Sequence, residues 1–370
     1  MAVGNPAVRR SSPVVLAGDE RVAARLPGAA RRVRRGDARW IIGAALLVVV
    51  AVAVGVSVGP AALPFGGVVR DLLGRLPFVH LRSGLTPTQH AILWQFRLPR
   101  VTLGLIVGGL LSCCGAAYQG VFRNPLADPF LLGSAAGAGL GATIVIVYGG
   151  GRLLPVAAFV GALVAVACAY TVGTRAAAGS TSPAPLLLAG VAVAALFTAM
   201  QTFVQQRHAN SLREVYSWIL GRLNIANWQD VVLVLPYATI AVVTLLATRR
   251  LLDVLRVGEL EAGSVGLDVR RIRLIVVAAA TLGTAAAVAV AGLIGFVGII
   301  VPHLVRLLAG PSYRRLVPLS LLAGGAFVVL ADLLARTVTS PGEVPIGVVT
   351  SFLGAPFFLL VLRTHNGRQT

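Results

Sequence analysis

Ten apolar stretches separated by short polar segments constrain this 370-residue chain more than any other feature. A helix needs about 20 mostly apolar residues to cross the hydrocarbon core of a bilayer. Lipid offers no partner to free backbone N–H and C=O groups, so such stretches are expected to be helical. The sequence therefore predicts an all-α, polytopic membrane protein with about ten transmembrane helices, at residues 40–60, 98–120, 130–149, 153–174, 184–205, 230–248, 273–293, 294–309, 316–335 and 345–363.

The composition agrees with this interpretation and excludes other classes of protein. Hydrophobic residues make up 57% of the chain, charged residues make up 12%, and the mean hydropathy is +0.86. A soluble globular protein carries about 25% charged residues, roughly twice as many. A disordered protein, a disulfide scaffold and an ordinary cytosolic enzyme are therefore excluded.

All 32 basic residues are arginines, and the chain contains no lysine. A P-loop needs a lysine on the β- and γ-phosphates, so a separate polypeptide must supply any ATP-driven step. The sequence also shows no nucleophile–base set, no carboxylate pair and no cluster of metal ligands. We therefore predict that the chain is not an enzyme and that it has no cofactor and no metal site.

The formal net charge of +19 is concentrated near the N-terminus, where nine arginines fall within the first 39 residues. Basic chains often bind nucleic acid, but arginines beside apolar spans are typical of the cytoplasmic side of a membrane, and we predict no nucleic-acid partner. We expect a disordered cytoplasmic tail over 1–39, a membrane domain over 40–363 and a cytoplasmic tail over 364–370. A cleaved signal peptide is the alternative for the first span. The loop arginines that support the same orientation are Arg249, Arg250, Arg256, Arg270, Arg271 and Arg273.

Glycines mark both a break and close helix contacts. The segment 273–309 is almost continuously apolar, and we expect it to split near Gly292, Gly295 and Gly298. Elsewhere, glycines four residues apart at 104 and 108, and again over 133–141, would let helix backbones approach each other in lipid.

Several charged residues fall near the ends of the predicted spans, where they are expensive to bury. Asp332 and Arg336 are four residues apart, so they share one face of a helix. They either form a local ion pair or bring Arg336 to the external surface, where it meets a partner. Arg97 and Arg100 stand at the start of another span, where long side chains also serve as snorkelling anchors.

Three further segments interrupt the apolar pattern. The stretch 123–129 holds two prolines and is either a connecting turn or part of a permeation path. His303 is a lone histidine, which is a structural hydrogen-bonding group more often than a ligand. The charged stretch 253–273 is expected to form short amphipathic helices with turns near Gly258 and Gly263, and such an element suits a soluble partner.

Taken in order along the chain, these stretches resemble the FecCD family of ABC importer permeases, the iron-siderophore, haem and vitamin B12 type. The resemblance covers about residues 40–363. It rests on spaced motifs in register, namely Arg97-Leu98-Pro99-Arg100, Asn124-Pro125-Leu126-Ala127-Asp128-Pro129, Leu187-Leu188-Ala189-Gly190-Val191, Gly258-Glu259 with Gly266-Leu267, Gly295-Phe296-Val297-Gly298 running into Val301-Pro302-His303, and Pro345-Ile346-Gly347 with Gly354-Ala355-Pro356.

The resemblance implies a vitamin B12 permease-like fold in the cell membrane, with both termini cytoplasmic. It implies two permease subunits, identical or related, two copies of an ATP-binding ABC subunit and an extracytoplasmic substrate-binding protein. By the same resemblance, Arg97, Arg100 and Arg336 receive acidic residues of the binding protein. The implied ATPase coupling loop contains Gly258, Glu259, Ala262, Val265, Gly266 and Leu267.

The function implied is import of an iron-siderophore complex driven by ATP that separate subunits hydrolyse. Vitamin B12 and haem are the alternative cargoes, because the binding protein supplies most of the selectivity. An ion-coupled secondary transporter is a rival from another class and would need a membrane-buried acid, for which Asp332 is the candidate. A membrane haem enzyme would need paired histidines, which are missing. The candidates for the translocation pathway are Asn124, Pro125, Ser180, Thr181, Ser182 and His303.

Overall fold

The computed structural model describes residues 26–75, 82–149, 151–177, 184–264, 266–340 and 342–366, with backbone alone for 26–37, 259–261, 362 and 364–366. The chain divides into two units, residues 1–42 and 43–370. In the first unit, helical backbone runs from Leu26 into the apolar part of helix α2. Helix is therefore present in part of the segment expected to be a disordered tail, as the helix-favouring alanines and arginines there allow. Residues 1–25 lie outside the described residues.

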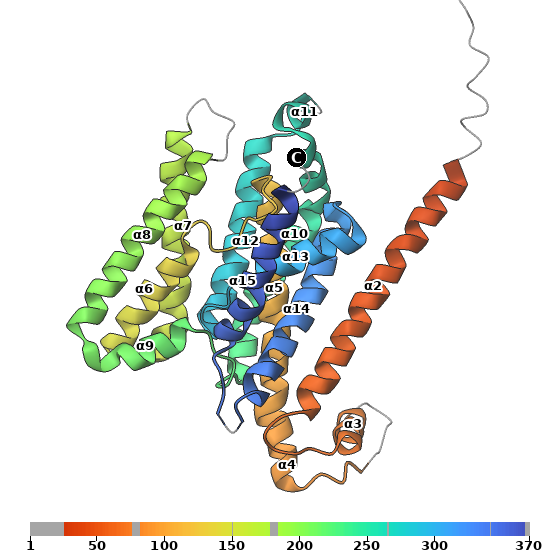
Figure 1. The fold of residues 1–370 in the computed structure, drawn as a ribbon, viewed down its shortest axis with the longest axis vertical. Coiled ribbons are helices and arrows are strands. Elements are labelled where there is room, and N and C mark those ends of the chain that lie inside the picture. The colour runs from red at the N-terminus through yellow and green to blue at the C-terminus, as the bar shows by residue number, and fades with distance from the viewer. Residues whose placement is uncertain are drawn as a thin grey trace, which may run out of the picture. The chain divides into compact units, whose positions relative to one another are not determined.

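The described part of the chain is helical and contains no strand, which confirms the predicted all-α membrane class. Among the described residues, seven helices are long and apolar enough to cross a membrane, and three apolar helices are shorter. Figure 1 labels the α elements, whose bounds are α2 (Leu26–Ser57), α3 (Phe65–Leu73), α4 (Pro87–Ala91), α5 (Leu98–Val121), α6 (Ser134–Val147), α7 (Leu154–Ala176), α8 (Ala184–Arg207), α9 (Leu212–Ile219), α10 (Trp228–Val257), α11 (Glu259–Ser264), α12 (Val269–Ala291), α13 (Val297–Ala309), α14 (Tyr313–Thr337) and α15 (Ile346–Asn366).

The predicted break in the apolar segment 273–309 is confirmed. Helix α12 ends at Ala291, and Gly292 follows with a φ of 70°, a conformation that favours glycine. Helix α13 begins at Val297, after Phe296, which also has a positive φ of 68°. A positive φ strains the backbone of a phenylalanine. The Phe296 ring fills the space that a side chain on Gly354 of α15 would need.

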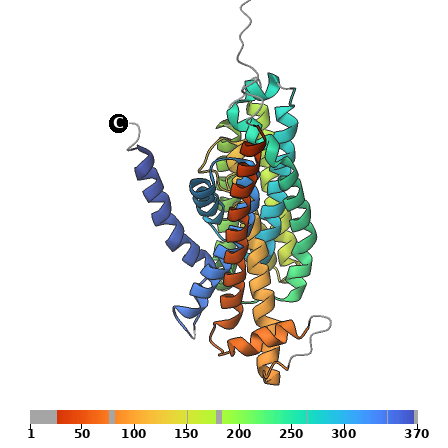
Figure 2. The same ribbon diagram turned by 90° about the vertical axis from the view of Figure 1, so that its right-hand side faces the viewer.

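Helix α5 is the centre of the second unit and packs against α10, α12, α13 and α14. Most of its residues are buried, as expected for a helix with apolar side chains on every face. Helix α15 contacts α13 and α14 and then diverges from the other helices, as Figure 2 shows in dark blue. Several large side chains on its surface are exposed, including Phe352 and Leu360.

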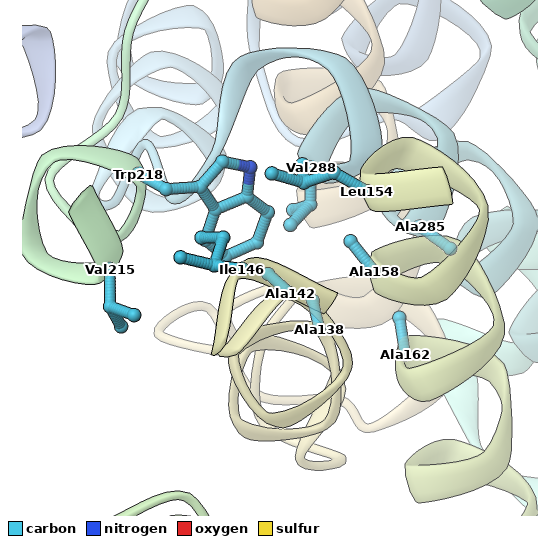
Figure 3. Close-up of a cluster of buried hydrophobic side chains, with 10 residues drawn as sticks. All are labelled: Ala138, Ala142, Ile146, Leu154, Ala158, Ala162, Val215, Trp218, Ala285 and Val288. Carbon is cyan, nitrogen blue, oxygen red and sulfur yellow. The ribbon is translucent and has the colours of Figure 1, made fainter. Parts of the chain in front are cut away.

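A second group of helices, α6, α7 and α9, joins this bundle through α12. Figure 3 shows the buried cluster that connects them, in which Trp218 of α9 lies among small and branched side chains. Glycines at 137 and 161 bring α6 and α7 so close that a Cβ on either would collide with the other helix's backbone. The small-residue spacing in the sequence therefore has the packing role that it predicted.

The sequence analysis did not anticipate the short helices α3, α4 and α9. Helix α4 continues into a π-helical turn over Ile92–Arg97, which leads directly into α5. Thr86 and Gln89 form a capping box at the start of α4, through hydrogen bonds of 3.2 and 3.0 Å. These elements lie at the end of the second unit opposite α11, and we call the two ends the α4 end and the α11 end (Figure 1).

The tightest contact of α5 gives a testable prediction. A Cβ on Gly115 would collide with the carbonyl oxygen of Gly298 at the start of α13, and backbone cannot rotate away. We expect Gly115→Ala to lower the free energy of unfolding by about 1–3 kcal/mol, the usual cost of overpacking. Gly43→Ala is the control, since nothing lies within 4 Å of that position. Equal melting temperatures of the two variants in detergent would contradict the packing argument.

Candidate functional site

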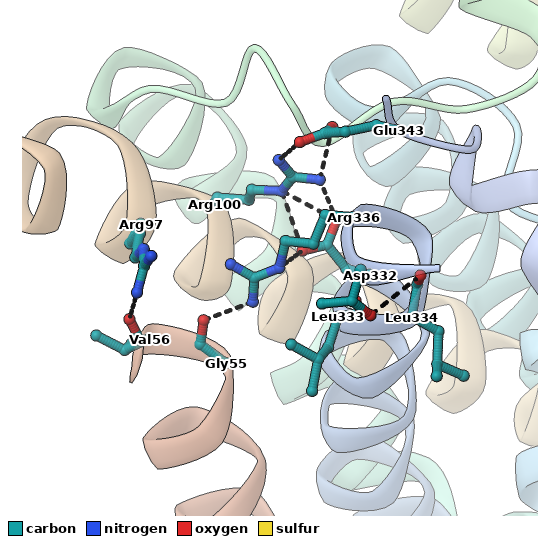
Figure 4. Close-up of polar contacts among 10 residues, drawn as sticks. Gly55, Val56, Arg97, Arg100, Asp332, Leu333, Leu334, Arg336 and Glu343 are labelled. Atoms are coloured by element: carbon teal, nitrogen blue, oxygen red, sulfur yellow. Dashed lines mark hydrogen bonds and ion pairs between the residues drawn. The ribbon is translucent and has the colours of Figure 1, made fainter. Parts of the chain in front are cut away.

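A buried network of arginines and acids lies at the α4 end, where α5 begins and α14 ends (Figure 4). Arg100 binds Asp332 of α14 through Nε and Nη2, at 2.8–3.0 Å. It also binds Glu343, which follows α14, through Nη1 at 2.9 Å and Nη2 at 3.1 Å. One planar guanidinium therefore holds two carboxylates, each along one of its edges, as its fork geometry allows.

Arg97 and Arg336, beside the same network, bind backbone carbonyls at the end of α2. Arg97 donates to the carbonyl oxygens of Val56 at 2.7 Å and Ser57 at 2.6 Å, and to that of Ala61. Arg336 donates to the carbonyl of Gly55 at 2.5 Å (Figure 4). The last carbonyls of a helix have no partner within it, so these arginines cap the C-terminus of α2.

The structure brings Arg97, Arg100 and Arg336 together, as their proposed common role requires. The local pairing of Arg336 with Asp332 is confirmed at 3.5 Å, although Arg100 makes the shorter contacts with that acid. In this conformation Arg97 and Arg336 are only 5% and 2% exposed, so neither is a snorkelling anchor that reaches solvent. Docking through these arginines stays a prediction.

A polar cavity of about 140 Å³ adjoins this network. Its lining includes Arg100, Asp332 and Glu343 of the network, and also Arg222 and Asn224. Burial lowers the pKa of Arg222, while the nearby carboxylates of Glu214 and Asp230 raise it. The sequence analysis singled out neither Arg222 nor Glu343. Glu343 pairs with Arg100, which lies 243 positions earlier, and the sequence around either residue does not indicate this pairing.

The stretch 123–129 is a connecting turn that its own polar side chains shape. The side chain of Asn124 accepts from the Leu126 N–H at 2.9 Å, and that of Asp128 accepts from the Phe130 N–H at 2.7 Å. Both are local turn bonds of a kind that Asn and Asp favour. Burial raises the pKa of Asp128 to about 6, against the effect of its hydrogen bond, which lowers it.

The turn is also fixed to α13, which joins two of the sequence motifs. Pro129 packs on Gly298, where a Cβ would clash with the proline ring. Gln119 of α5 donates to the carbonyls of Gly298 at 3.1 Å and Ala127 at 3.4 Å, and it accepts from Arg306 at 2.5 Å. These contacts account for the turn structurally. A pathway role for Asn124 and Pro125 stays a prediction.

Of the other pathway candidates, His303 lies on α13 with its ring edge-to-face against Phe357 of α15, the centroids 5.8 Å apart. Ser180, Thr181 and Ser182 lie outside the described residues.

The predicted coupling loop forms the short helix α11 and the turn that follows it. Gly258 ends α10, and its carbonyl accepts from the Ala262 N–H at 3.0 Å. Ala262 is fully buried, Gly266 has a φ of 81°, and the Leu267 N–H donates to Ala262 at 3.2 Å. For Glu259 only the backbone is described, and Val265 lies outside the described residues. The predicted short helix with turns on either side is therefore present.

Asp253 of α10, a few residues before α11, ties this element to α14. Its carboxylate accepts from the hydroxyl of Ser312 at 2.8 Å and from the N–H groups of Tyr313 at 2.7 Å and Arg314 at 3.3 Å. An acid at a helix N-terminus satisfies free N–H groups and complements the helix dipole. The N-terminus of α14 is therefore bonded to Asp253, which lies on α10 shortly before α11. The same helix carries Asp332 and Arg336 near its C-terminus.

Within the described ranges, no group of three or more His, Cys, Asp and Glu side chains is placed to hold a metal ion.

Comparison with known proteins identifies the arrangement. The FecCD transport family matches residues 46–364. The chain is 44% identical over 291 residues to the cobalamin import system permease of Halobacterium salinarum, covering 78% of each chain. It is 39% identical over 292 residues to the hemin transport system permease of Yersinia pestis, covering 74% of this chain and 84% of the relative.

A solved structure of an ABC transporter assigned to the metal-chelate type, in an inward-facing conformation, has the same fold. It matches with a TM-score of 0.77 at 27% identity, over 88% of this chain and 98% of that one. The family match includes both ends of the molecule described above. The chain therefore belongs to the FecCD transport family and is an ABC importer permease.

Proposed function

We propose that this permease forms the membrane pathway of an importer for a bulky iron-siderophore complex, driven by ATP that separate subunits hydrolyse. The observation that carries the proposal is the family match over residues 46–364. The placement of a short helix at one end and an arginine network at the other suits two soluble partners on opposite faces.

The α11 end is proposed to face the cytoplasm, with both chain termini on that side. Arginines gather near this end, on the last turns of α10 and the first turns of α12, and such residues favour the cytoplasmic face. Helix α11 would then meet an ATP-binding subunit, and two copies of that subunit would serve a pair of permease subunits. The first residues, 1–39, would be a cytoplasmic tail, with the membrane domain over 40–363 and a tail over 364–370.

The second permease subunit, identical or related, is proposed to cover part of the apolar surface of the chain. Exposed large side chains are frequent on α8, where Leu188, Val191 and Phe203 are 62–69% exposed. In a bilayer these side chains contact either lipid or another apolar protein surface. The translocation pathway would run between the two subunits, and Asn124, Pro125, Ser180, Thr181, Ser182 and His303 remain its candidate residues.

The α4 end is proposed to receive acidic side chains of an extracytoplasmic substrate-binding protein through Arg97, Arg100 and Arg336. Arg100 is the most accessible of the three, with 13% of its side chain exposed. The other two hold the end of α2, so contact with them requires that end to move.

Cobalamin is a second candidate cargo, favoured by the 44% identical relative named as a cobalamin import permease. The hemin permease relative is 39% identical, so haem is a third. All three cargoes are large metal complexes of an organic ligand, and the binding protein would choose among them.

Reconstitution tests the proposal and separates the cargoes. The permease is placed in liposomes with its ATP-binding subunit and its binding protein, and uptake of a ferric siderophore, cobalamin and haemin is compared. We expect uptake of the ferric siderophore only when ATP and the ATP-binding subunit are both present. The permease alone should hydrolyse no ATP. Uptake that follows a proton gradient and ignores ATP would instead identify a secondary transporter.

The secondary-transporter alternative is weakened by the surroundings of its candidate acid. Asp332 accepts three hydrogen bonds from Arg100 and lies 3.5 Å from Arg336. Both oxygens of this acid are already bonded to cations, so it offers a coupling ion no free binding position.

A further inference from the structure

The carboxylate of Glu343 stands where a docking partner's acid would bind. We propose that Glu343 occupies Arg100 in the undocked permease as an internal substitute for an acidic side chain of the binding protein, and that it must leave for docking to be completed. This inference rests on the proposed function and names a residue that would set the docking affinity.

The geometry of Arg100 leaves no complete binding edge for a further carboxylate. Asp332 takes the edge formed by Nε and Nη2, and Glu343 takes the edge formed by Nη1 and Nη2. A guanidinium binds a carboxylate best through two parallel N–H groups. An incoming acid therefore gains a two-bond contact with Arg100 only after one of the resident acids has moved.

The two resident acids differ in how easily they can leave. The side chain of Asp332 is 4% exposed, lies inside α14 and also approaches Arg336. The side chain of Glu343 is 29% exposed and belongs to the link between α14 and α15. A hydrogen bond from the Val344 N–H to the Ala335 carbonyl, at 2.9 Å, holds the backbone beside Glu343. This bond does not involve the Glu343 side chain, which can leave Arg100 while the backbone stays in place. Glu343 is the acid that a partner displaces.

The adjoining cavity can receive the displaced side chain. Its volume is about 140 Å³, and its lining includes both Glu343 and Arg222. When Glu343 leaves Arg100 it can turn into this space towards a second guanidinium. Its charge then keeps a cationic neighbour during docking.

The test is the affinity of the permease–ATPase complex, in nanodiscs, for its purified binding protein. Glu343→Gln keeps the size of the side chain and removes the charge that competes for Arg100. The partner must break the Glu343–Arg100 ion pair before it binds, and a partly exposed ion pair is worth about 1 kcal/mol or less. Removing that cost should lower the dissociation constant by about fivefold. Glu214→Gln is the control for the loss of one exposed negative charge at the same end, because Glu214 acts on Arg222 and not on Arg100. It should change the dissociation constant by less than about twofold.

A Glu343→Gln complex that binds as weakly as the wild type, or more weakly, overturns the inference. If that variant fails to assemble, Glu343→Asp is tested in its place. The shorter aspartate side chain holds Arg100 less well, so the Glu343→Asp complex should also bind the partner more tightly than the wild type. Unchanged or weaker binding by Glu343→Asp then overturns it. Failure of the wild-type complex to bind the partner at all would overturn the docking proposal itself. Wild-type binding with no effect of Glu343 would overturn only the present inference.

Discussion

Replacing Asp332 with alanine is expected to destabilise the permease strongly. Asp332 is 3% exposed and is the acid shared by Arg100 and Arg336. Removing one partner of a buried ion pair leaves an uncompensated charge, which costs about 3–5 kcal/mol. We expect a much lower melting temperature in detergent and loss of transport in proteoliposomes.

Two further variants show whether the cost arises from the orphaned cation. Glu214→Ala removes an exposed acid at the same end and should leave stability within about 0.5 kcal/mol of the wild type. Arg100 keeps Glu343 when Asp332 is removed, so Arg336 is the cation left without a bonded acid. Adding Arg336→Met to Asp332→Ala removes that cation, so part of the lost stability should return. If Asp332→Ala melts at the wild-type temperature, the carboxylate is not needed to hold the arginines, and the network described here is wrong.

Replacing Arg97 with methionine is expected to release the end of α2 from the bundle. Arg97 donates to the carbonyls of Val56, Ser57 and Ala61, and methionine cannot donate to any of them. A buried carbonyl left without a partner costs about 1–3 kcal/mol. The Val56 contact is buried and the other two are part-buried, so we expect a total loss on the order of 3 kcal/mol. Arg97→Lys should be intermediate, because an ammonium lacks the planar fork that spans several acceptors.

Labelling of an introduced cysteine gives a local measure of this release. Val56 is 1% exposed, so Val56→Cys should react slowly with a maleimide in the parent protein and faster when Arg97→Met is added. Arg75→Met is the matched control, because Arg75 lies at the same end but stacks over Trp94 at 4.2 Å. Equal labelling rates in the Arg97 and Arg75 variants would show that Arg97 does not hold α2.

Several features could be predicted from the sequence because their causes are local. The ten apolar stretches became helices, since a segment without polar side chains must satisfy its backbone within itself when lipid surrounds it. The break before α13 followed from glycine, whose conformational freedom is a property of the residue. The pairing of Asp332 with Arg336 followed from a spacing of four on one helix.

Other features had no local cause and appeared only in the folded chain. The short helices α3, α4 and α9 are too brief to show a clear pattern in sequence. Asp253 reads as one more loop acid, yet it caps the start of α14 across 60 residues. Arg97 read as a surface anchor, and in the structure it is buried against the end of α2.

The sequence by itself determined that this chain is a multi-span α-helical membrane protein that lacks the lysine of a P-loop, because hydrophobic length and residue content are properties of the sequence alone. Only the tertiary structure decided which charges meet. Arg100 finds Asp332 and Glu343, 232 and 243 residues away, and a single helix end needs two arginines to satisfy its carbonyls. The physical reason is that a buried charge is costly unless it is paired and hydrogen-bonded, and the packing of helices distant in sequence decides which partner lies beside it.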